Sequence, residues 1–147
     1  MAVPTGSGTE TLHSHMFEDL DASSNIIVGV QHHVYTVLSI ICYCNVLNAT
    51  SDKGYVEVKG HSGHQGTSNV GHAIFNTGST QVGETFVWNE KFSFNGYEPA
   101  GTNVFSAAEQ ILIAAQGGSV AQVLYWSSDS SVDDFDVIVT YLDQDWS

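Results

Sequence analysis

Alternating hydrophobic and polar residues predict β-strands along most of the chain after residue 25. In YVEVK at 55–59, both valines lie on one face and Glu57 and Lys59 lie on the other, which is the period of a half-buried strand. Other runs are rich in β-branched and aromatic residues and are bounded by Gly, Asn, Ser and Asp, which are typical of turns. The expected strands are 26–30, 34–47, 55–59, 72–75, 84–96, 110–115, 119–127 and 135–142.

The longest apolar run, VYTVLSIICYCNVL at 34–47, is mostly hydrophobic on both of its faces. A strand with two apolar faces is normally covered on both sides, so this run predicts a central strand, either inside a sandwich or at a subunit interface. Cys42 and Cys44 are the only cysteines of the chain and share one face of this strand. A bridge between them would close a small, strained ring, so both are expected to be buried free thiols.

The run ETFVWNEKFSFNG at 84–96 collects four aromatic side chains and Glu90 on one face. Such a face forms either part of the core or a binding platform. Glu90 could serve as the acid of a glycosidase, but the sequence places no second carboxylate beside it. The chain also has no G-x-S-x-G, P-loop or G-x-G-x-x-G motif, and these motifs mark several large enzyme classes. The protein is therefore not expected to be an enzyme.

Short strands that recur every 8–12 residues or so, with polar turns between them, predict an all-β fold. We expect an antiparallel β-sandwich, jelly-roll-like in topology, with an N-terminal extended arm. The arm covers residues 1–24, which are polar apart from a small apolar group at Met16, Phe17 and Leu20. A single β-sandwich domain is expected over residues 25–147.

The charge of the chain excludes several classes of partner. Three lysines, no arginine and sixteen acidic residues give a formal net charge of −13. Binding to nucleic acid or to an anionic membrane depends on lysine and arginine, so neither is an expected partner. The first ten residues, MAVPTGSGTE, also lack the basic and apolar regions of a signal peptide, and export is not expected.

Two polar segments contain residue types that bind metals. GHSGHQGTSNVGH at 60–72 supplies three histidines, enough in number for a zinc site, but its glycines oppose the helix that an H-E-x-x-H site requires. We expect this segment to be a loop between strands 55–59 and 72–75. The acidic loop near 129–136 supplies carboxylates that suit calcium, but their spacing is not that of an EF-hand loop. No metal and no cofactor is expected. The residues concerned are His61, His64 and His72 in the first segment, and Asp129, Asp133, Asp134, Asp136, Asp143 and Asp145 in or near the second.

The last third of the chain, GTNVFSAAEQILIAAQGGSVAQVLYWSSDSSVDDFDVIVTYLDQDWS, is similar in pattern to the head decoration, or cement, proteins of tailed bacteriophages. In these proteins an apolar strand, an Ala/Gly/Ser turn, a second apolar strand and a final strand recur. The resemblance implies a virion structural protein on the outer capsid surface, with no catalytic chemistry. It would bind the major capsid protein, associate with copies of itself, often as a homotrimer, and stabilise the shell.

Two classes of function follow for the apolar and aromatic residues. If the chain is a capsid protein, some of the apolar and aromatic side chains are expected to contact neighbouring subunits. The candidates are Met16, Phe17, Leu20, Tyr35, Tyr43 and Trp146. The alternative is a carbohydrate- or receptor-binding β-sandwich module of a phage tail or fibre. That function would need an exposed platform in which Trp88, Tyr125 or Trp126 stacks on sugar rings.

Overall fold

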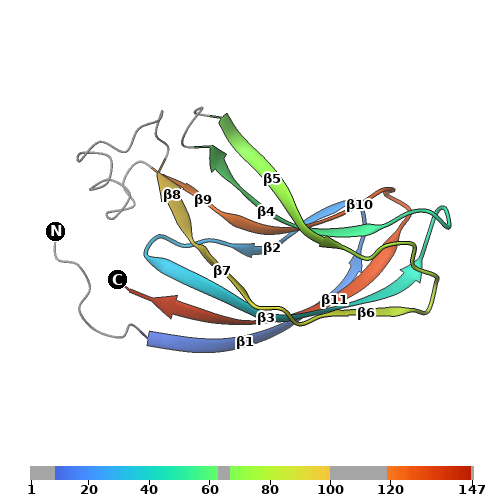
Figure 1. Cartoon of the computed structure of the whole chain (residues 1–147), viewed down its shortest axis with the longest axis horizontal. Helices are drawn as coiled ribbons and strands as arrows, with labels where there is room; N and C mark the ends of the chain where they lie inside the picture. The colour runs from blue at the N-terminus through green and yellow to red at the C-terminus, as the bar shows by residue number, and fades with distance from the viewer. Residues whose placement is uncertain (1–8, 63–66, 100–118, 147) are drawn as a thin grey trace.

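The computed structural model describes residues 9–62, 67–99 and 119–146. The strand predicted at 110–115 and the residue His64 lie outside these ranges. The described part of the chain is built from strands (Figure 1), and none of its segments is a helix long and apolar enough to cross a membrane. The strands are β1 (Thr9–Leu20), β2 (Ser23–Val28), β3 (His33–Val46), β4 (Gly54–Ser62), β5 (Thr67–Asn76), β6 (Thr85–Trp88), β7 (Phe92–Asn95), β8 (Tyr97–Pro99), β9 (Ser119–Ala121), β10 (Val123–Ser128) and β11 (Asp134–Asp145).

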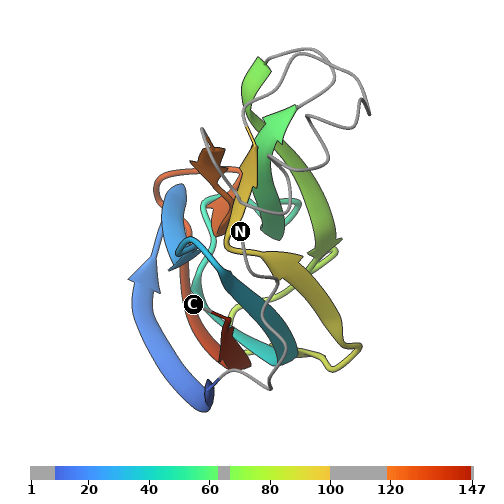
Figure 2. The same cartoon turned by 90° about the vertical axis from the view of Figure 1, so that its left-hand side faces the viewer.

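Most of these strands form two antiparallel sheets that face each other (Figures 1 and 2). Sheet A has the order β1-β11-β3-β6, and β7 pairs with β3 next to β6. Sheet B has the order β2-β10-β4-β5, and β8 and β9 form a separate short ladder. The predicted all-β antiparallel sandwich is therefore confirmed.

The strand order is that of a jelly roll. The earliest and the latest strands pair with each other, as β1 with β11 and β2 with β10. Inside these pairs, β3 meets β6 and β7, and β4 meets β5. The chain thus resembles one long hairpin rolled across two sheets, which is the arrangement of a jelly roll, and the predicted topology is confirmed.

Residues 9–20, part of the predicted extended arm, form the edge strand of sheet A. From Thr9 to Phe17 each residue of β1 faces a residue of β11 without a shift in register. The register shifts between Phe17 and Leu20, and Asp19 has a positive φ of 55° there. A bulge of this kind bends a strand and ends its regular pairing, so the regularly paired part of β1 lies before Glu18.

The aromatic face predicted at 84–96 packs into the core. The segment forms two short strands, β6 and β7, and Glu90 is exposed in the break between them. Phe94 is buried, while Phe86, Trp88 and Phe92 pack against the core from its margin. Phe75 of β5 stacks on both Phe86 and Trp88, at ring-centroid distances of 5.2 and 5.5 Å. These rings close one side of the sandwich.

In the central strand β3, the core-facing residues are odd-numbered in its first part and even-numbered in its second part. Tyr35 and Val37 are buried before the register shift opposite Thr140 and Tyr141. After it, the buried residues are Ile40, Cys42 and Cys44. The strand is central, as predicted, and its two apolar faces result in part from this change of side.

The histidine-containing segment at 60–72 is mostly strand, so the prediction of a loop over its whole length is wrong. β4 continues to Ser62 and β5 begins at Thr67. The two strands pair Val58 with His72 and Gly60 with Val70. A hairpin ladder can accommodate glycines, and composition alone therefore overstated the length of the loop.

Three chain segments meet at a joint between the two sheets, which we call the glycine joint (Gly29, Gly96 and Gln122). The Gly29 N–H donates to the Gln122 carbonyl, the Gln122 N–H to the Gly96 carbonyl, and the Gly96 N–H to the His33 carbonyl, each at 2.8 Å. A Cβ atom built on Gly96 would lie 1.9 Å from the Val30 carbonyl oxygen. The backbones approach so closely that only glycine fits.

Candidate functional site

A row of four apolar side chains crosses the outer face of sheet A. Cross-strand pairing aligns Met16 of β1 with Ile138 of β11, Ile138 with Ile41 of β3, and Ile41 with Val87 of β6. Met16 and Val87 are 56% and 58% exposed, and the two isoleucines are half-buried. All their neighbours along the strands except the exposed His15 are buried or pack against the core, so these four side chains face away from it.

The rows beside it are uncharged. One aligns Ser14, Thr140 and Ser39, and the next aligns Leu12, Leu142, Thr36 and Ser93. Hydroxyl groups bond across strands within these rows, from Ser14 to Thr140 at 3.2 Å and from Thr36 to Ser93 at 2.9 Å. We name the three rows together the outer patch; its residues are Leu12, Ser14, Met16, Thr36, Ser39, Ile41, Val87, Ser93, Ile138, Thr140 and Leu142.

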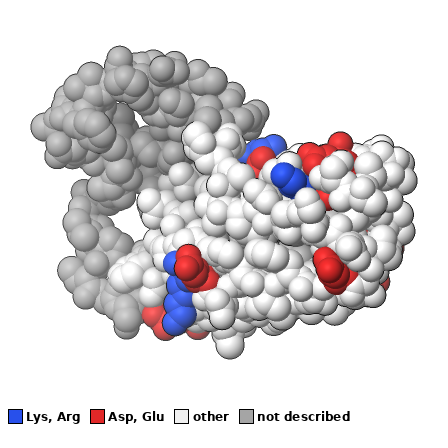
Figure 3. Space-filling view, turned by 45° about the vertical axis from the view of Figure 1, so that its right-hand side comes forward, with Lys and Arg blue, Asp and Glu red and all other residues white. Residues whose placement is uncertain are grey.

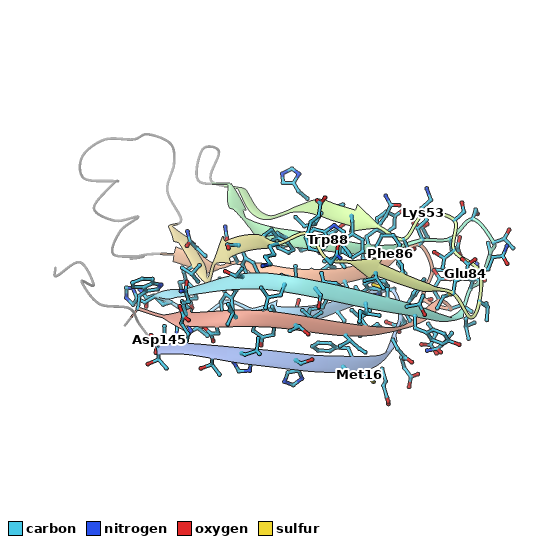
Figure 4. All side chains as sticks on the ribbon, turned by 60° about the horizontal axis from the view of Figure 1, so that its bottom comes forward. Met16, Lys53, Glu84, Phe86, Trp88 and Asp145 are labelled. Atoms are coloured by element: carbon cyan, nitrogen blue, oxygen red, sulfur yellow. The ribbon has the colours of Figure 1, made fainter. Side chains whose placement is uncertain are left out.

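Charged residues lie around the outer patch, at its two ends and in the break between β6 and β7, where Glu90 and Lys91 are exposed. Glu10 bonds Gln144 at 2.7 Å beyond one end, and Asp136 pairs with Tyr43 beyond the other. In the view of Figure 4, the labelled Asp145 and Glu84 lie toward opposite ends of the molecule, with Met16 on β1. Figure 3 gives a different view of the molecule, in which charged residues form small separate groups with uncharged surface between them.

The structure separates the predicted interface residues into two groups. Met16 and Tyr43 are exposed on the outer side of sheet A. Leu20 and Tyr35 are 7% and 3% exposed and belong to the core cluster, where they stabilise the protomer itself.

The remaining two candidates lie at the margins. Phe17 packs against the core from β1. Trp146 is half-buried, and its backbone N–H donates to the His32 carbonyl at 2.9 Å. A contact of Phe17 or Trp146 with another subunit stays a prediction.

The aromatic residues proposed for a sugar platform do not form one. Trp126 is completely buried, and Trp88 lies in the aromatic stack at the margin of the core. Tyr125 is on the outer side of sheet B, where the Lys59 ammonium lies 3.2 Å above its ring centroid. The amine occupies the face on which a sugar would stack.

The aspartates of the acidic loop have different surroundings. Asp133 is buried and accepts the N–H groups of Asn48 and Ser130 at 2.9 and 3.0 Å. Asp129 accepts the Lys53 N–H at 3.0 Å and the Tyr55 hydroxyl at 3.1 Å. These two carboxylates therefore fasten loops to each other rather than converging on one point.

Asp134 and Asp136 instead come together with Asp19 of the β1 bulge. The three carboxylates offer ligand atoms within 4.8 Å of one another, and Asp136 accepts the Asp19 N–H at 3.1 Å. Sequence reasoning missed Asp19, because only the pairing of β1 with β11 brings it here. Grouped carboxylates are common on protein surfaces without a bound cation, so the cluster alone does not identify a metal site.

A histidine and two aspartates fasten the end of β11 to β3. His33 Nδ1 lies 2.7 Å from Asp143 Oδ1, and its Nε2 lies 3.6 Å from Asp145 Oδ1. Burial, followed by the nearby Asp143 carboxylate, raises the pKa of Tyr35 to about 12. The Val30 N–H donates to the Tyr35 hydroxyl at 3.2 Å. The Tyr35 side chain therefore also stabilises the turn between β2 and β3.

Cys42 and Cys44 are buried free thiols, as predicted. Burial raises the pKa of Cys42 to about 12 and also raises that of Cys44, with smaller contributions from Asp133, Asp134 and Glu84. The thiolate is the reactive form of cysteine, and both burial and the raised pKa suppress it.

We expect neither thiol to react with iodoacetamide in the folded protein at pH 8. The same reagent should label both thiols, Cys42 and Cys44, after unfolding in urea. Intact-mass spectrometry over time measures the difference, which we expect to exceed about 100-fold in rate because protection scales with the rarity of opening. Rapid labelling of the folded protein would contradict the burial described here.

Comparisons with known proteins show similarity of structure only. No family model matches the chain, and no curated protein matches it in sequence. Among solved structures, one similar chain is from the acidic stable capsid structure of Helicobacter pylori bacteriophage KHP30, with 9% identity, 97% of this chain and 92% of that chain covered, and a TM-score of 0.49.

Two further similar structures come from different sources. A chain of turnip yellow mosaic virus has 13% identity, 99% and 85% coverage of the two chains, and a TM-score of 0.36. A chain of the Bacillus endospore appendages, which form disulfide-linked pili, has 10% identity, 100% and 96% coverage, and a TM-score of 0.37. Two of the three structures are viral, and at these TM-scores none of them assigns a function to this chain.

Proposed function

We propose that the chain is a virion structural protein that binds the outer surface of a capsid and stabilises the shell. The single observation that carries the proposal is the outer patch, an uncharged and partly apolar surface on a protein with a net charge of −13. Jelly rolls occur in viral capsid domains, and also in lectins and cupins. Because one fold serves many functions, the function must be inferred from the residues on the surface and not from the fold.

The charge of the protein limits where it can meet another subunit. Like charges brought together at an interface oppose association, and sixteen acidic residues against three lysines leave this protein with an excess of negative charge. The outer patch avoids this cost and offers apolar area, which contributes about 25 cal/mol for each Å² buried. We propose the outer patch as the surface in contact with the major capsid protein.

We propose a homotrimer as the form that binds. Stable interfaces bury about 800 Å² on each partner, and a small domain that binds through one face gains from repeating the contact. Closed symmetry presents several copies of the same patch to the shell at once, and the linked contacts bind together more tightly than one alone.

The experiment compares two substitutions of matched size and exposure. Val87→Lys places an ammonium in the outer patch, while Val28→Lys does the same on β2 of sheet B, where Val28 is 53% exposed. Each purified variant is mixed with virus particles from the source of the chain that have been stripped of this protein, and co-sedimentation is measured. We expect Val87→Lys to weaken binding at least about tenfold, as loss of an apolar contact with burial of a charge requires, and Val28→Lys to bind like the unaltered chain.

Two results would overturn the proposal. One is absence of the chain from purified particles by mass spectrometry, and the other is equal binding by the two variants. Light scattering tests the trimer separately, since three copies have three times the 15.8 kDa mass of the chain. Retention of monomers on a glycan array would support the lectin-like alternative instead.

A further inference from the structure

The free side of β1 is a long unpaired sheet edge. Within the ranges that the structure describes, β1 is the terminal strand of sheet A and pairs only with β11. Figures 1 and 2 show it along the rim of the molecule. Every second residue of an edge strand directs its N–H and C=O groups away from the sheet, so β1 presents a row of backbone donors and acceptors to a partner.

The other described edges carry features that discourage pairing. β6 and β7 have four residues each and are separated by a break that contains Glu90 and Lys91. β2 has six residues, and the ladder of β5 with β4 has two register shifts. Short strands, charges and irregularities are the usual protections of sheet edges. From Thr11 to Phe17, β1 has no charged residue, proline, glycine or bulge.

The sequence of this unprotected segment is nearly symmetric about its centre. In LHSHM, residues 12–16, Ser14 is flanked by two histidines and then by two large apolar residues. When two identical strands pair antiparallel across a twofold axis at Ser14, Leu12 of one faces Met16 of the other, and His13 faces His15. Leu12 and Met16 are both apolar, His13 and His15 are identical, and each of these pairs occurs twice, as in an isologous contact; the outermost pair, Thr11 with Phe17, joins unlike residues.

We propose that β1 pairs antiparallel with β1 of a second copy of this chain, with the twofold axis at Ser14. The paired segment is Thr11–Phe17 in both copies, and the acidic residues Glu10, Glu18 and Asp19 lie outside it. Main-chain hydrogen bonds then supply much of the affinity, as in other cases of strand addition. A second copy is the partner because only an identical strand uses the symmetry of the segment.

This pairing enlarges the outer patch. A twofold axis perpendicular to the sheet keeps the outer faces of both copies on the same side. The row from Val87 through Ile41 and Ile138 to Met16 then continues into Leu12 and Leu142 of the second copy. The inference rests on β1 and not on capsid binding; a trimer would carry three such edges and could join neighbouring trimers through them.

A cysteine at the axis tests the pairing in the purified full-length protein. Residues directly opposite each other in an antiparallel ladder have Cα atoms about 4.5–5.5 Å apart, which is within the range of a disulfide. Ser14→Cys is therefore expected to give mostly covalent dimers on mild oxidation, measured on a non-reducing gel. The native cysteines do not interfere, because both are buried.

Thr140→Cys is the matched control. Ser14 and Thr140 face each other on adjacent strands and share one hydroxyl contact, so either substitution removes the same interaction. The two copies of residue 140 would be three strand spacings apart, about 14 Å, too far for a bridge. We expect less than about a tenth as much dimer from this variant, since a disulfide tolerates little change in distance.

A second measurement avoids oxidation. Ser14→Lys would place two ammonium groups at the axis and is expected to lower the mass measured by light scattering to that of the assembly without the β1 contact, while Thr140→Lys leaves the mass unchanged. Equal cross-linking by the two cysteine variants, or an unchanged mass for Ser14→Lys, would overturn the pairing. Either result would leave the capsid-binding test with Val87→Lys unaffected, so the two proposals fail separately.

Discussion

Replacing Gly96 with alanine is expected to lower the free energy of unfolding by about 3 kcal/mol or more, at the upper end of the usual cost of overpacking. The new methyl group would lie 1.9 Å from the Val30 carbonyl oxygen and 2.8 Å from the Val30 nitrogen. These are backbone atoms, so no side-chain rotation relieves the clash. The segments must move apart, which breaks the hydrogen bonds of the glycine joint. Urea unfolding followed by tryptophan fluorescence measures the loss.

Gly71→Ala is the control for a glycine that lacks such contacts. Gly71 lies in a strand as well, but its Cβ would meet the Lys59 side chain at 3.0 Å at the closest. A flexible lysine can move aside, and surface substitutions of this kind usually change stability by less than about 0.5 kcal/mol. Similar losses for Gly71→Ala and Gly96→Ala would show that the joint is not as close as described.

Trp126→Ala is expected to cost about 3–5 kcal/mol, the range for removing a large buried aromatic side chain. Trp126 is fully buried, and its ring lies 5.0 Å from that of Phe135 on the opposite sheet. Its Nε1–H donates to the Asp21 carbonyl at 3.2 Å. The variant thus loses contact between the sheets and leaves a cavity. Calorimetry or urea unfolding gives the change.

Trp126→Phe keeps an aromatic ring in the core but loses the indole N–H. It therefore separates the contribution of ring packing from that of the hydrogen bond to the Asp21 carbonyl. It can also be combined with Gly54→Ala. A Cβ at Gly54 would lie 2.1 Å from Cη2 of Trp126, an atom that phenylalanine lacks. We expect the double variant to be more stable than the sum of the single effects by about 1 kcal/mol or more, as for residues in direct contact. Simple additivity would contradict the described packing.

The strands could be predicted from local sequence because alternation and β-branched residues act over a few positions. YVEVK lies within β4, and the run at 135–142 lies within β11. β1 was not predicted as a strand of the sheet, because threonine, glutamate, histidine and serine dominate its sequence. Its strand conformation is supported by pairing with β11, more than 100 residues away, and no local pattern reports a contact at that distance.

The candidate site was predicted only in part for a related reason. Met16 could be named because it is an apolar residue in a mostly polar segment, and Tyr43 because it is an aromatic residue in the long apolar run at 34–47. Ile138 and Val87 could not, because each is an isolated apolar residue on an otherwise mostly polar strand face. Only the pairing of distant strands aligns them in one row. The neighbours of Ile138, Val137 and Val139, are fully buried, and only the assembled sandwich shows that Ile138 therefore lies outside.

The position of β11 between β1 and β3 also determines when the protein can fold. Thr9 pairs with Asp145, and Val46 pairs with Asp134. Neither β1 nor β3 can therefore complete its pairing before the ribosome has synthesised β11. The complete sandwich is therefore expected to form after synthesis has passed β11. Folding should be slow, on the millisecond to second scale typical of β-sandwiches with distant pairings. Until then β3 lacks its neighbour, and newly made chains at high concentration are vulnerable to pairing with one another.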